Sequence, residues 1–370
     1  MKSVALLFFI LAPLFAHASR ARVGSLGRSE HLIDTQVIYR NPLVLNYLPG
    51  QLELETGVPA TSATISRFSF AEATVVFRGT DDRRFALSFG HQEDAVAFGR
   101  YIAADLNLPP PLAQNPIGFF YAKKGDDFNF SYGLTFSNFR DEFASEREKS
   151  AVLRLGYELG AWQFYGLTAL QNEAHYLARD FEGSGLVSLH AKYFGESVEY
   201  FAEIGNSSVR VSSTAGLQES HDFQTAIIGF VSPSTKEGND VFWGMQVEGF
   251  RINCSRRAGM GCSGGFSYTT LPFLMGFEMR AMPWLTLRGS FSQAVLLNQV
   301  KDEIGYNLSE ISQTTGAMNN INGGPNNTTV NMGCSLNFGQ FSLDGLLTAA
   351  QSQKLNQTDF LNQIGLKYSF

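Results

Sequence analysis

The chain has 370 residues, of which 13% are aromatic and 17% are charged, and phenylalanine alone accounts for 32. A net charge of -6 argues against a nucleic-acid partner, and three cysteines are too few for a disulfide framework in a chain of this size. Many aromatic residues among few charges are typical of the aromatic girdles of membrane β-barrels.

The first 18 residues have the pattern of a secretory signal peptide. Met1-Lys2 is a short basic region, Val4 to Phe15 is an apolar run, and Ala16-His17-Ala18 has the small-x-small form of a cleavage site. The apolar run is too short to span a bilayer as a helix, and no later uncharged run has the length that a transmembrane helix needs. We therefore expect residues 1–18 to be removed, and we expect no transmembrane helix.

Residues 19–49 show no sustained period, and we expect them to be a periplasmic lead-in ahead of a barrel at residues 50–370. The lead-in carries Arg20, Arg22 and Arg28 and ends near Asn41-Pro42. This dipeptide is similar to the amino-terminal region of fatty-acid-transporter-type barrels, and a plain turn is the other interpretation.

From residue 51 onwards, apolar and polar side chains alternate, which predicts strands with one apolar and one polar face. The clearest case is 128–136, where five large apolar residues face one way and Asn, Ser, Gly and Thr face the other. The count is about 16 strands, or about 14 if the two weakest early strands merge or fail. They are expected near 51–55, 68–78, 84–91, from 119, 128–136, 150–160, 162–172, 186–194, 197–205, 223–232, 241–252, 269–281, 284–297, 328–338, 341–351 and from 359.

Short and long connections alternate between these strands. If the last strand runs towards the periplasm, then all the short turns fall on the periplasmic side and all the long polar loops fall outside. Bacterial outer-membrane barrels have this asymmetry and an even number of strands. The sequence therefore predicts an all-β chain that forms a transmembrane antiparallel β-barrel.

The segment from Glu93 to Pro111 interrupts the alternation. Val96, Ala97, Ile102 and Leu106 suggest one face of a helix. The apolar positions of the segment, Val96, Phe98, Ile102 and Leu106, need a surface to cover. We expect this extracellular segment to fold inward and narrow the lumen, in the way that the constriction loop of general porins does. Arg100 and Asp105 would then face the pore. The alternative is a helix that lies over the barrel rim.

Charged side chains in the predicted strands lie on the faces opposite the apolar ones, where they avoid the cost of contact with lipid. Two interpretations stay open, because these residues would serve equally as opposed charges across an open pore or as ion pairs that stiffen the wall. The candidate pore-lining residues are Arg154, Glu158, His190, Lys192, Glu199, Glu203, Glu248, Glu278, Arg280, Arg288, Asp344 and Lys367.

Little in the sequence points to catalysis or to a cofactor. The histidines are scattered without metal-ligand spacing, and no Gly-rich phosphate loop occurs between a strand and a helix. Cys254 and Cys262 flank a Gly-rich segment, and a disulfide between them would close one extracellular loop. Cys334 lies on the apolar face of a predicted strand and is expected to stay unpaired. We expect a non-enzyme that needs no metal and no cofactor.

The last eight residues place Ile364, Leu366, Tyr368 and Phe370 on one face of a strand. They resemble the terminal signal of Gram-negative outer-membrane β-barrel proteins, which has a polar residue, a glycine, an apolar residue and a terminal aromatic at set places. Here these places are held by Gln363, Gly365, Tyr368 and Phe370. The resemblance implies recognition by the barrel-assembly machinery and a location in the outer membrane.

A barrel of 14 to 16 strands is wide enough for a water-filled lumen, so the leading hypothesis is a porin-like channel for passive diffusion of small hydrophilic solutes. One alternative is a transporter of hydrophobic compounds of the fatty-acid-transporter type, with the amino-terminal segment as a hatch. Another is a non-conducting structural or adhesive surface protein. An apolar pocket below the outer loops would favour the hydrophobic transporter. Outer-membrane lipid, the assembly machinery and small solutes are the expected partners, and a homo-oligomer stays an open alternative.

Overall fold

The computed structural model describes residues 19–57, 70–79, 82–93, 96, 113, 116–141, 146–176, 179–213, 216, 218–236, 238–258, 264–297, 301–302, 328–349 and 363–370. The expected signal peptide lies outside these residues and stays a prediction. No helix in the described part of the chain is long and apolar enough to cross a membrane.

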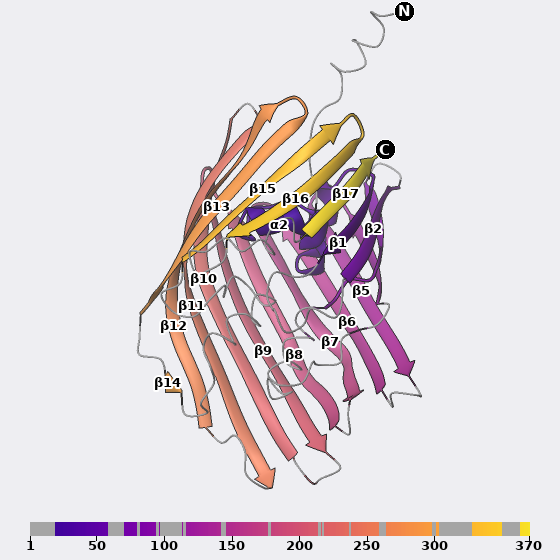
Figure 1. Cartoon of the computed structure of the whole chain (residues 1–370), viewed down its shortest axis with the longest axis vertical. Coiled ribbons are helices and arrows are strands. Elements are labelled where there is room, and N and C mark those ends of the chain that lie inside the picture. Colours follow the sequence, from indigo (N-terminus) through magenta and orange to yellow (C-terminus); the bar gives the residue numbers. More distant parts are fainter. Residues whose placement is uncertain are drawn as a thin grey trace, which may run out of the picture.

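Nearly all of the described chain after Gly50 is β-strand (Figure 1). The strands are β1 (Gln51–Gly57), β2 (Phe70–Arg78), β3 (Arg83–Phe89), β4 (Ile117–Lys123), β5 (Phe128–Asp141), β6 (Glu146–Leu159), β7 (Trp162–Tyr176), β8 (Arg179–Phe194), β9 (Glu199–Ser213), β10 (Gln218–Lys236), β11 (Asn239–Ala258), β12 (Gly264–Met282), β13 (Leu285–Leu296), β14 (Lys301–Asp302), β15 (Thr328–Phe338), β16 (Phe341–Ala349) and β17 (Gln363–Ser369).

The strands close into a barrel. Each long strand pairs antiparallel with its neighbours along the chain, and β17 pairs with β1 in the register Leu54↔Leu366. The sheet has 17 strands, of which β14 has only two residues and borders the end of β12. The other 16 form the closed wall, so the prediction of a 16-stranded antiparallel barrel is confirmed.

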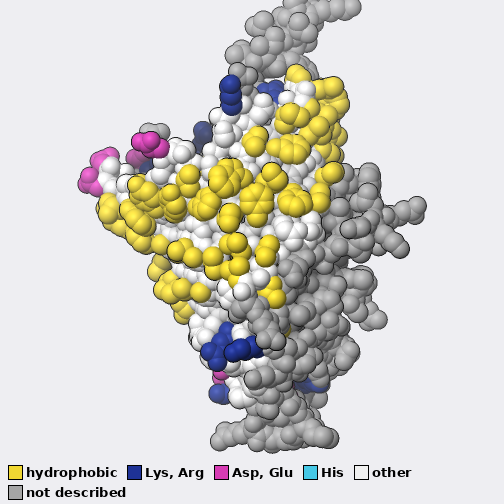
Figure 2. All heavy atoms as spheres, turned by 90° about the vertical axis from the view of Figure 1, so that its left-hand side faces the viewer, with side chains coloured by type: hydrophobic (Ala, Val, Ile, Leu, Met, Phe, Trp, Pro, Cys, Tyr) yellow, Lys and Arg dark blue, Asp and Glu magenta, His cyan; other side chains and the backbone are white. Residues whose placement is uncertain are grey.

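Exposed apolar side chains lie on the outer faces of strands throughout the barrel, and Figure 2 shows them as a belt across one face. The belt includes the exposed, outward-facing residues Leu134, Leu155, Leu189, Ile204, Ile228, Phe277, Met332, Leu343 and Leu366. An apolar surface of this extent would not be stable in water, so it marks the part of the wall that contacts lipid. The chain is thus an outer-membrane barrel, with its short turns at one end and its long connections at the other.

Strands β5 to β12 are longer at their extracellular ends than the sequence predicted from the alternation of apolar, lipid-facing residues. The segments 140–149, 173–183 and 206–221, which lie between the expected strands and were therefore expected to be loops, are mostly strand in their described residues. In these parts the alternation continues with its sense reversed: Val209 and Val211 face inward and are buried, whereas Arg210 faces outward. Where a strand extends past the membrane into water, its outer face can be polar. The pattern of apolar outward-facing residues therefore ends before the strand ends.

Residues 19–48, here called the luminal segment, lie inside the barrel and not on its periplasmic side. The segment contains α2 (Arg20–Ser25), η1 (Thr35–Tyr39) and η2 (Pro42–Tyr47). The side chains of Ser19, Asp34 and Asn41 each accept a hydrogen bond from a backbone N–H in the first turn that follows. Figure 1 shows these short elements between the walls, in the half of the barrel where the chain ends.

Helix α2 lies against β13, β15, β16 and β17, and η2 lies against β3 to β6. Two inward-facing glycines leave room for α2. A Cβ atom at Gly365 would lie 2.5 Å from Cβ of Ser19, and one at Gly333 would lie 2.6 Å from Cβ of Ser25. A larger side chain at either glycine would therefore have to displace the helix.

Candidate functional site

Polar contacts hold the luminal segment to the wall on several sides, and the first set involves β1 and β2. The backbone N–H of Arg20 donates to Glu55, and its guanidinium donates to Glu72 over 2.8 Å. His91 contacts the Glu72 carboxylate over 3.0 Å and stacks on the ring of Tyr39. The start of α2 is thereby attached to the two strands that follow it in the sequence.

The second set joins α2 to β12, β13 and β16. The Arg22 guanidinium lies 3.2 Å from Asp34 and 2.8 Å from Glu278. Arg288 lies 2.5 Å from the same Glu278 carboxylate and 2.8 Å from Asp344. Burial alone would lower the pKa of Arg22, but Glu278 and Asp34 outweigh it and raise that pKa above its ordinary value. The arginine is therefore charged, and the five groups form a chain of alternating sign.

The third set lies on β8 and β9. Arg40 forms ion pairs with Glu30 of the luminal segment and with Glu203 of β9, the latter over 2.8 Å. Lys192 donates to the backbone carbonyl of Glu30 over 2.9 Å. His190 lies 3.4 Å from Glu203. The Arg40–Glu203 and Lys192–Glu30 contacts join residues more than 150 positions apart, so they are specified by the folded barrel and not by local pattern.

The fourth set lies on β6. The hydroxyl of Tyr47 donates to Glu158 over 2.7 Å, and the Arg154 guanidinium donates to the backbone carbonyl of Tyr39. Arg154 also forms an ion pair with Glu93, at the start of the connection between β3 and β4. Together the four sets attach the luminal segment around much of the wall.

The structure places the sequence-predicted charged residues as follows. Six of them contact the luminal segment directly: Arg154, Glu158, His190, Lys192, Glu203 and Glu278. Glu199 pairs with Lys192, Arg288 pairs with Asp344, and Glu248 and Lys367 are buried on the inward faces of β11 and β17. Arg280 is exposed near the turn between β12 and β13 and donates to the carbonyl of Pro283. Most of these charges thus face protein groups, which is the arrangement expected of ion pairs that hold a structure together.

The expected constriction is described only at its start. Glu93 and Val96 reach the inner wall, where Val96 is buried with Val152, Leu167 and Leu186. Arg100 and Asp105 lie outside the described residues, so their role in a constriction stays a prediction.

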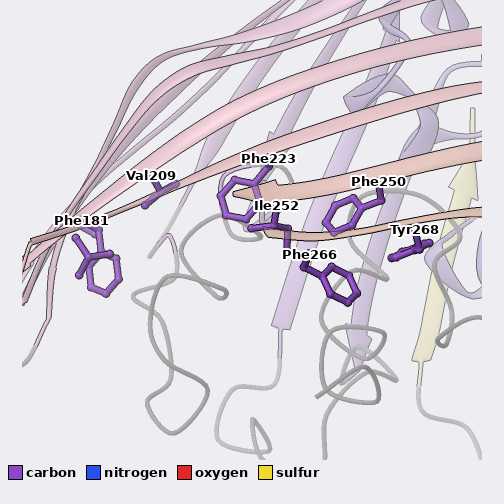
Figure 3. Close-up of a cluster of buried hydrophobic side chains, with 9 residues drawn as sticks. Phe181, Val209, Phe223, Phe250, Ile252, Phe266 and Tyr268 are labelled. Atoms are coloured by element: carbon purple, nitrogen blue, oxygen red, sulfur yellow. The ribbon is translucent and has the colours of Figure 1, made fainter. Parts of the chain in front are cut away.

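Between the luminal segment and the extracellular end of the barrel, the inner wall is apolar. A buried group, here called the aromatic cluster, comes from the inward faces of β7 to β12 and consists of Ala174, Phe181, Val209, Val211, Phe223, Phe250, Ile252, Phe266 and Tyr268 (Figure 3). Several members of this cluster fall in segments that were expected to be loops, so the cluster was not predicted from the sequence. The signal was present, since period-two alternation continues through 207–213 and 250–254.

Two polar groups adjoin the aromatic cluster. The Tyr268 hydroxyl is buried and, within the described residues, has no hydrogen-bond partner. Glu248 is buried one inward position below Phe250 and receives a long hydrogen bond from Gln246 at 3.5 Å. Among the described residues, no group of three or more His, Cys, Asp or Glu side chains is placed to hold a metal ion.

The cysteines differ in state. Cys334 is free and lies on the outward face of β15. Cys254 is disulfide-bonded and lies in β11, not in a loop. Cys262 lies outside the described residues, so the Cys254–Cys262 bridge stays a prediction.

No protein-family model matches the sequence, and no curated protein is significantly similar to it. Among solved structures, a FadL homologue from Pseudomonas aeruginosa has 10% sequence identity and a TM-score of 0.45 over 97% of this chain and 100% of that one. The toluene transporter TbuX from Ralstonia pickettii has 12% identity and a TM-score of 0.41, with 96% and 98% covered. A porin has 13% identity and a TM-score of 0.40, with 86% and 99% covered. These likenesses are too weak to assign a family or a function.

The last strand has the placement that its pattern predicted. Ile364, Leu366 and Tyr368 face outward, Lys367 faces inward, and the backbone N–H of Phe370 donates to the Gly50 carbonyl over 3.1 Å. The carboxy-terminal residue therefore sits at the seam between β17 and β1. Recognition of Gln363, Gly365, Tyr368 and Phe370 by the assembly machinery stays a prediction.

Deletion of Phe370 is expected to lower the amount of barrel that inserts into the outer membrane more than it lowers the stability of the barrel that does insert. Heat-modifiable migration of membrane fractions in gels measures the first quantity, and denaturant unfolding measures the second. Phe338→Ala is a matched control, because Phe338 is 58% exposed on β15 and Phe370 is 56% exposed. Normal membrane levels of the deletion variant would contradict the prediction.

Proposed function

We propose that this outer-membrane barrel is a channel for small hydrophobic compounds. These compounds enter from the outside and bind at the aromatic cluster, on the extracellular side of the luminal segment. The observation that carries the proposal is the apolar inner wall of β7 to β12. A lumen that conducts hydrophilic solutes has polar and charged groups along its water-filled path, and phenyl rings at this level would offer such solutes nothing.

The cluster suits a ligand that is mostly apolar and has one polar group. Ligand surface removed from water contributes about 25 cal/mol per Å², so a compound that buries roughly 200 Å² gains about 5 kcal/mol. The Tyr268 hydroxyl and the Glu248 carboxylate offer one or two polar contacts beside the rings. Apolar pockets with few polar groups are the usual form of small-molecule sites.

The luminal segment supports the same function. Its contacts with the wall lie in the periplasmic half of the barrel, opposite the aromatic cluster, where they obstruct free diffusion. A porin-like channel, which the sequence alone favoured, has no use for such an obstruction. A ligand that first accumulates at the cluster and then passes as the segment shifts explains both features.

Uptake measurements test the proposal. Cells that carry the wild-type protein should take up a radiolabelled hydrophobic compound, such as toluene or oleate, faster than cells without it. Replacing Phe250 and Phe266 together with Asn should lower that uptake about tenfold, since two apolar contacts of roughly 0.7 kcal/mol each are lost. Phe338→Asn is the control, because Phe338 faces outward.

Conductance in planar bilayers separates the alternatives. The proposal expects no steady conductance of small ions through the wild-type protein. Steady conductance without uptake of hydrophobic compounds would contradict it and favour a porin. Absence of both conductance and uptake would favour a structural or adhesive surface protein.

A further inference from the structure

The outer wall of the barrel contains a recess on its lipid-facing side. Its volume is about 560 Å³, and it lies across β8 to β12. Its lining includes Leu189, Ile204, Ala226, Gly249, Gln224 and Arg251. Phe250 and Tyr268 of the aromatic cluster also contribute to its lining, but most of its lining residues belong to the outward faces of these strands, opposite the lumen.

The strand register explains why the wall is hollow here. Ile204, Ala226, Gly249 and Thr269 lie side by side on four neighbouring strands. The side chain becomes small at Ala226 and is absent at Gly249, where an added Cβ would meet nothing closer than the Ala226 carbonyl oxygen at 3.9 Å. The exposed side chain of Ile204 lies beside these two small residues. A row of small residues beside large ones thus forms the floor of the recess.

The next outward-facing row, two residues nearer the extracellular end, is polar on five strands. It runs through Asn206, Gln224, Arg251, Ser267 and Lys301 in consecutive register. Two residues along a strand correspond to roughly 7 Å. The recess therefore has an apolar side towards the membrane centre and a polar side towards the extracellular surface. Arg251 lines the polar side, and Lys301 continues the same row beyond Ser267. Figure 2 shows basic side chains gathered beyond the apolar belt, at the end away from the chain termini.

Within the part of the chain that the structure describes, the two cations have no acidic partner. Arg251 is exposed and donates to the side chain of Asn253 over 3.1 Å, and Lys301 is exposed. Among the described residues neither forms an ion pair, and Asp222, which faces the same side one row further out, pairs with neither. By contrast, the exposed Arg210 pairs with Glu182. Cations without counter-charges at the edge of a lipid-facing surface attract anionic headgroups.

We propose that this recess is a binding site for a phosphorylated glycolipid of the outer leaflet. An acyl chain lies in the recess over Ala226 and Gly249, and a headgroup phosphate accepts hydrogen bonds from Arg251 and Lys301. Arginine recognises phosphate through paired N–H donors, and the apolar floor selects for an attached chain. The lipid spans the boundary between the apolar belt and the polar row.

Native mass spectrometry of the full-length protein in detergent, titrated with diphosphoryl lipid A, tests the proposal. We expect the wild-type protein to bind one molecule of lipid A more tightly than any further molecule. The double variant Arg251→Gln/Lys301→Gln should bind about tenfold more weakly, since two charge-assisted contacts are lost. Gly249→Leu, which fills the recess and keeps both cations, should weaken binding by a similar factor. Arg210→Gln is the matched control and should bind as wild type does.

Unchanged affinity in the Arg251→Gln/Lys301→Gln variant would overturn the proposal. If that variant alone loses affinity and Gly249→Leu does not, or if inorganic phosphate competes as well as the lipid, the site is a plain anion site and the lipid proposal fails. Heat-modifiable migration confirms that each variant is a folded barrel before the titration.

Discussion

Deletion of residues 20–47 is expected to convert the barrel into an open channel with steady ion conductance. The luminal segment makes its contacts with inward-facing groups of β1, β2, β6, β8, β9 and β12. None of these contacts forms part of the strand ladder. The closed ladder and the lipid contacts should therefore keep the barrel folded without the segment.

The open channel should prefer cations. The luminal segment carries four arginines against one glutamate and one aspartate, a net charge of +2. Its removal takes Arg20 away from Glu55 and Glu72 and takes Arg40 away from Glu203. Glu278 loses Arg22 but keeps Arg288. Rings of acidic side chains favour cations. The reversal potential under a KCl gradient measures this selectivity, and unchanged conductance would mean that other parts of the chain close the lumen.

A point variant tests the same idea without shortening the chain. Gly333→Leu places a side chain where Ser25 of α2 now lies, since even a Cβ would be 2.6 Å from Cβ of Ser25. We expect this variant to loosen α2 and to give intermittent openings in planar bilayers. Gly249→Leu, which points into open space on the outer wall, is the matched control and should leave conductance at the wild-type level.

The barrel could be predicted because its determinants are local. Alternation in 128–136 and in 363–370 states directly which residues face lipid, and the position of the charges follows from the same parity. Closure of β17 on β1 needs no further information, because a sheet in lipid cannot leave an edge unpaired. These arguments require only neighbouring residues and the properties of the bilayer.

The interior could not be predicted in the same way. The luminal segment consists of short helices without a sustained period, and its partners are distant in the sequence, as Arg22 and Glu278 are. Nothing local distinguishes such a segment from a periplasmic lead-in. The aromatic cluster was not predicted for a different reason. Phe181 and Val211 face inward in parts of strands whose outer face is polar, so these parts resembled loops.

Replacement of Arg154 by Ala is expected to destabilise the protein strongly. Its side chain is 0% exposed, and it donates to the Tyr39 carbonyl, to the Thr135 hydroxyl over 3.1 Å and to the Glu93 carboxylate. Breaking a buried ion pair from one side leaves an uncompensated charge and typically costs about 3–5 kcal/mol. The free energy of unfolding in denaturant, measured after reconstitution into lipid, should fall by an amount of that order.

Two controls separate this effect from the loss of any arginine. Arg210→Ala removes a cation whose partner Glu182 is as exposed as itself, and the free energy of unfolding should change little because water screens such pairs. The double variant Arg154→Met/Glu93→Gln removes both buried charges and should recover much of the stability that Arg154→Ala loses. If Arg154→Ala costs no more than Arg210→Ala, then Arg154 does not anchor the luminal segment and the connection after β3 to the wall. If the double variant is as unstable as the single one, the loss comes from the Tyr39 and Thr135 contacts and not from the unpaired carboxylate.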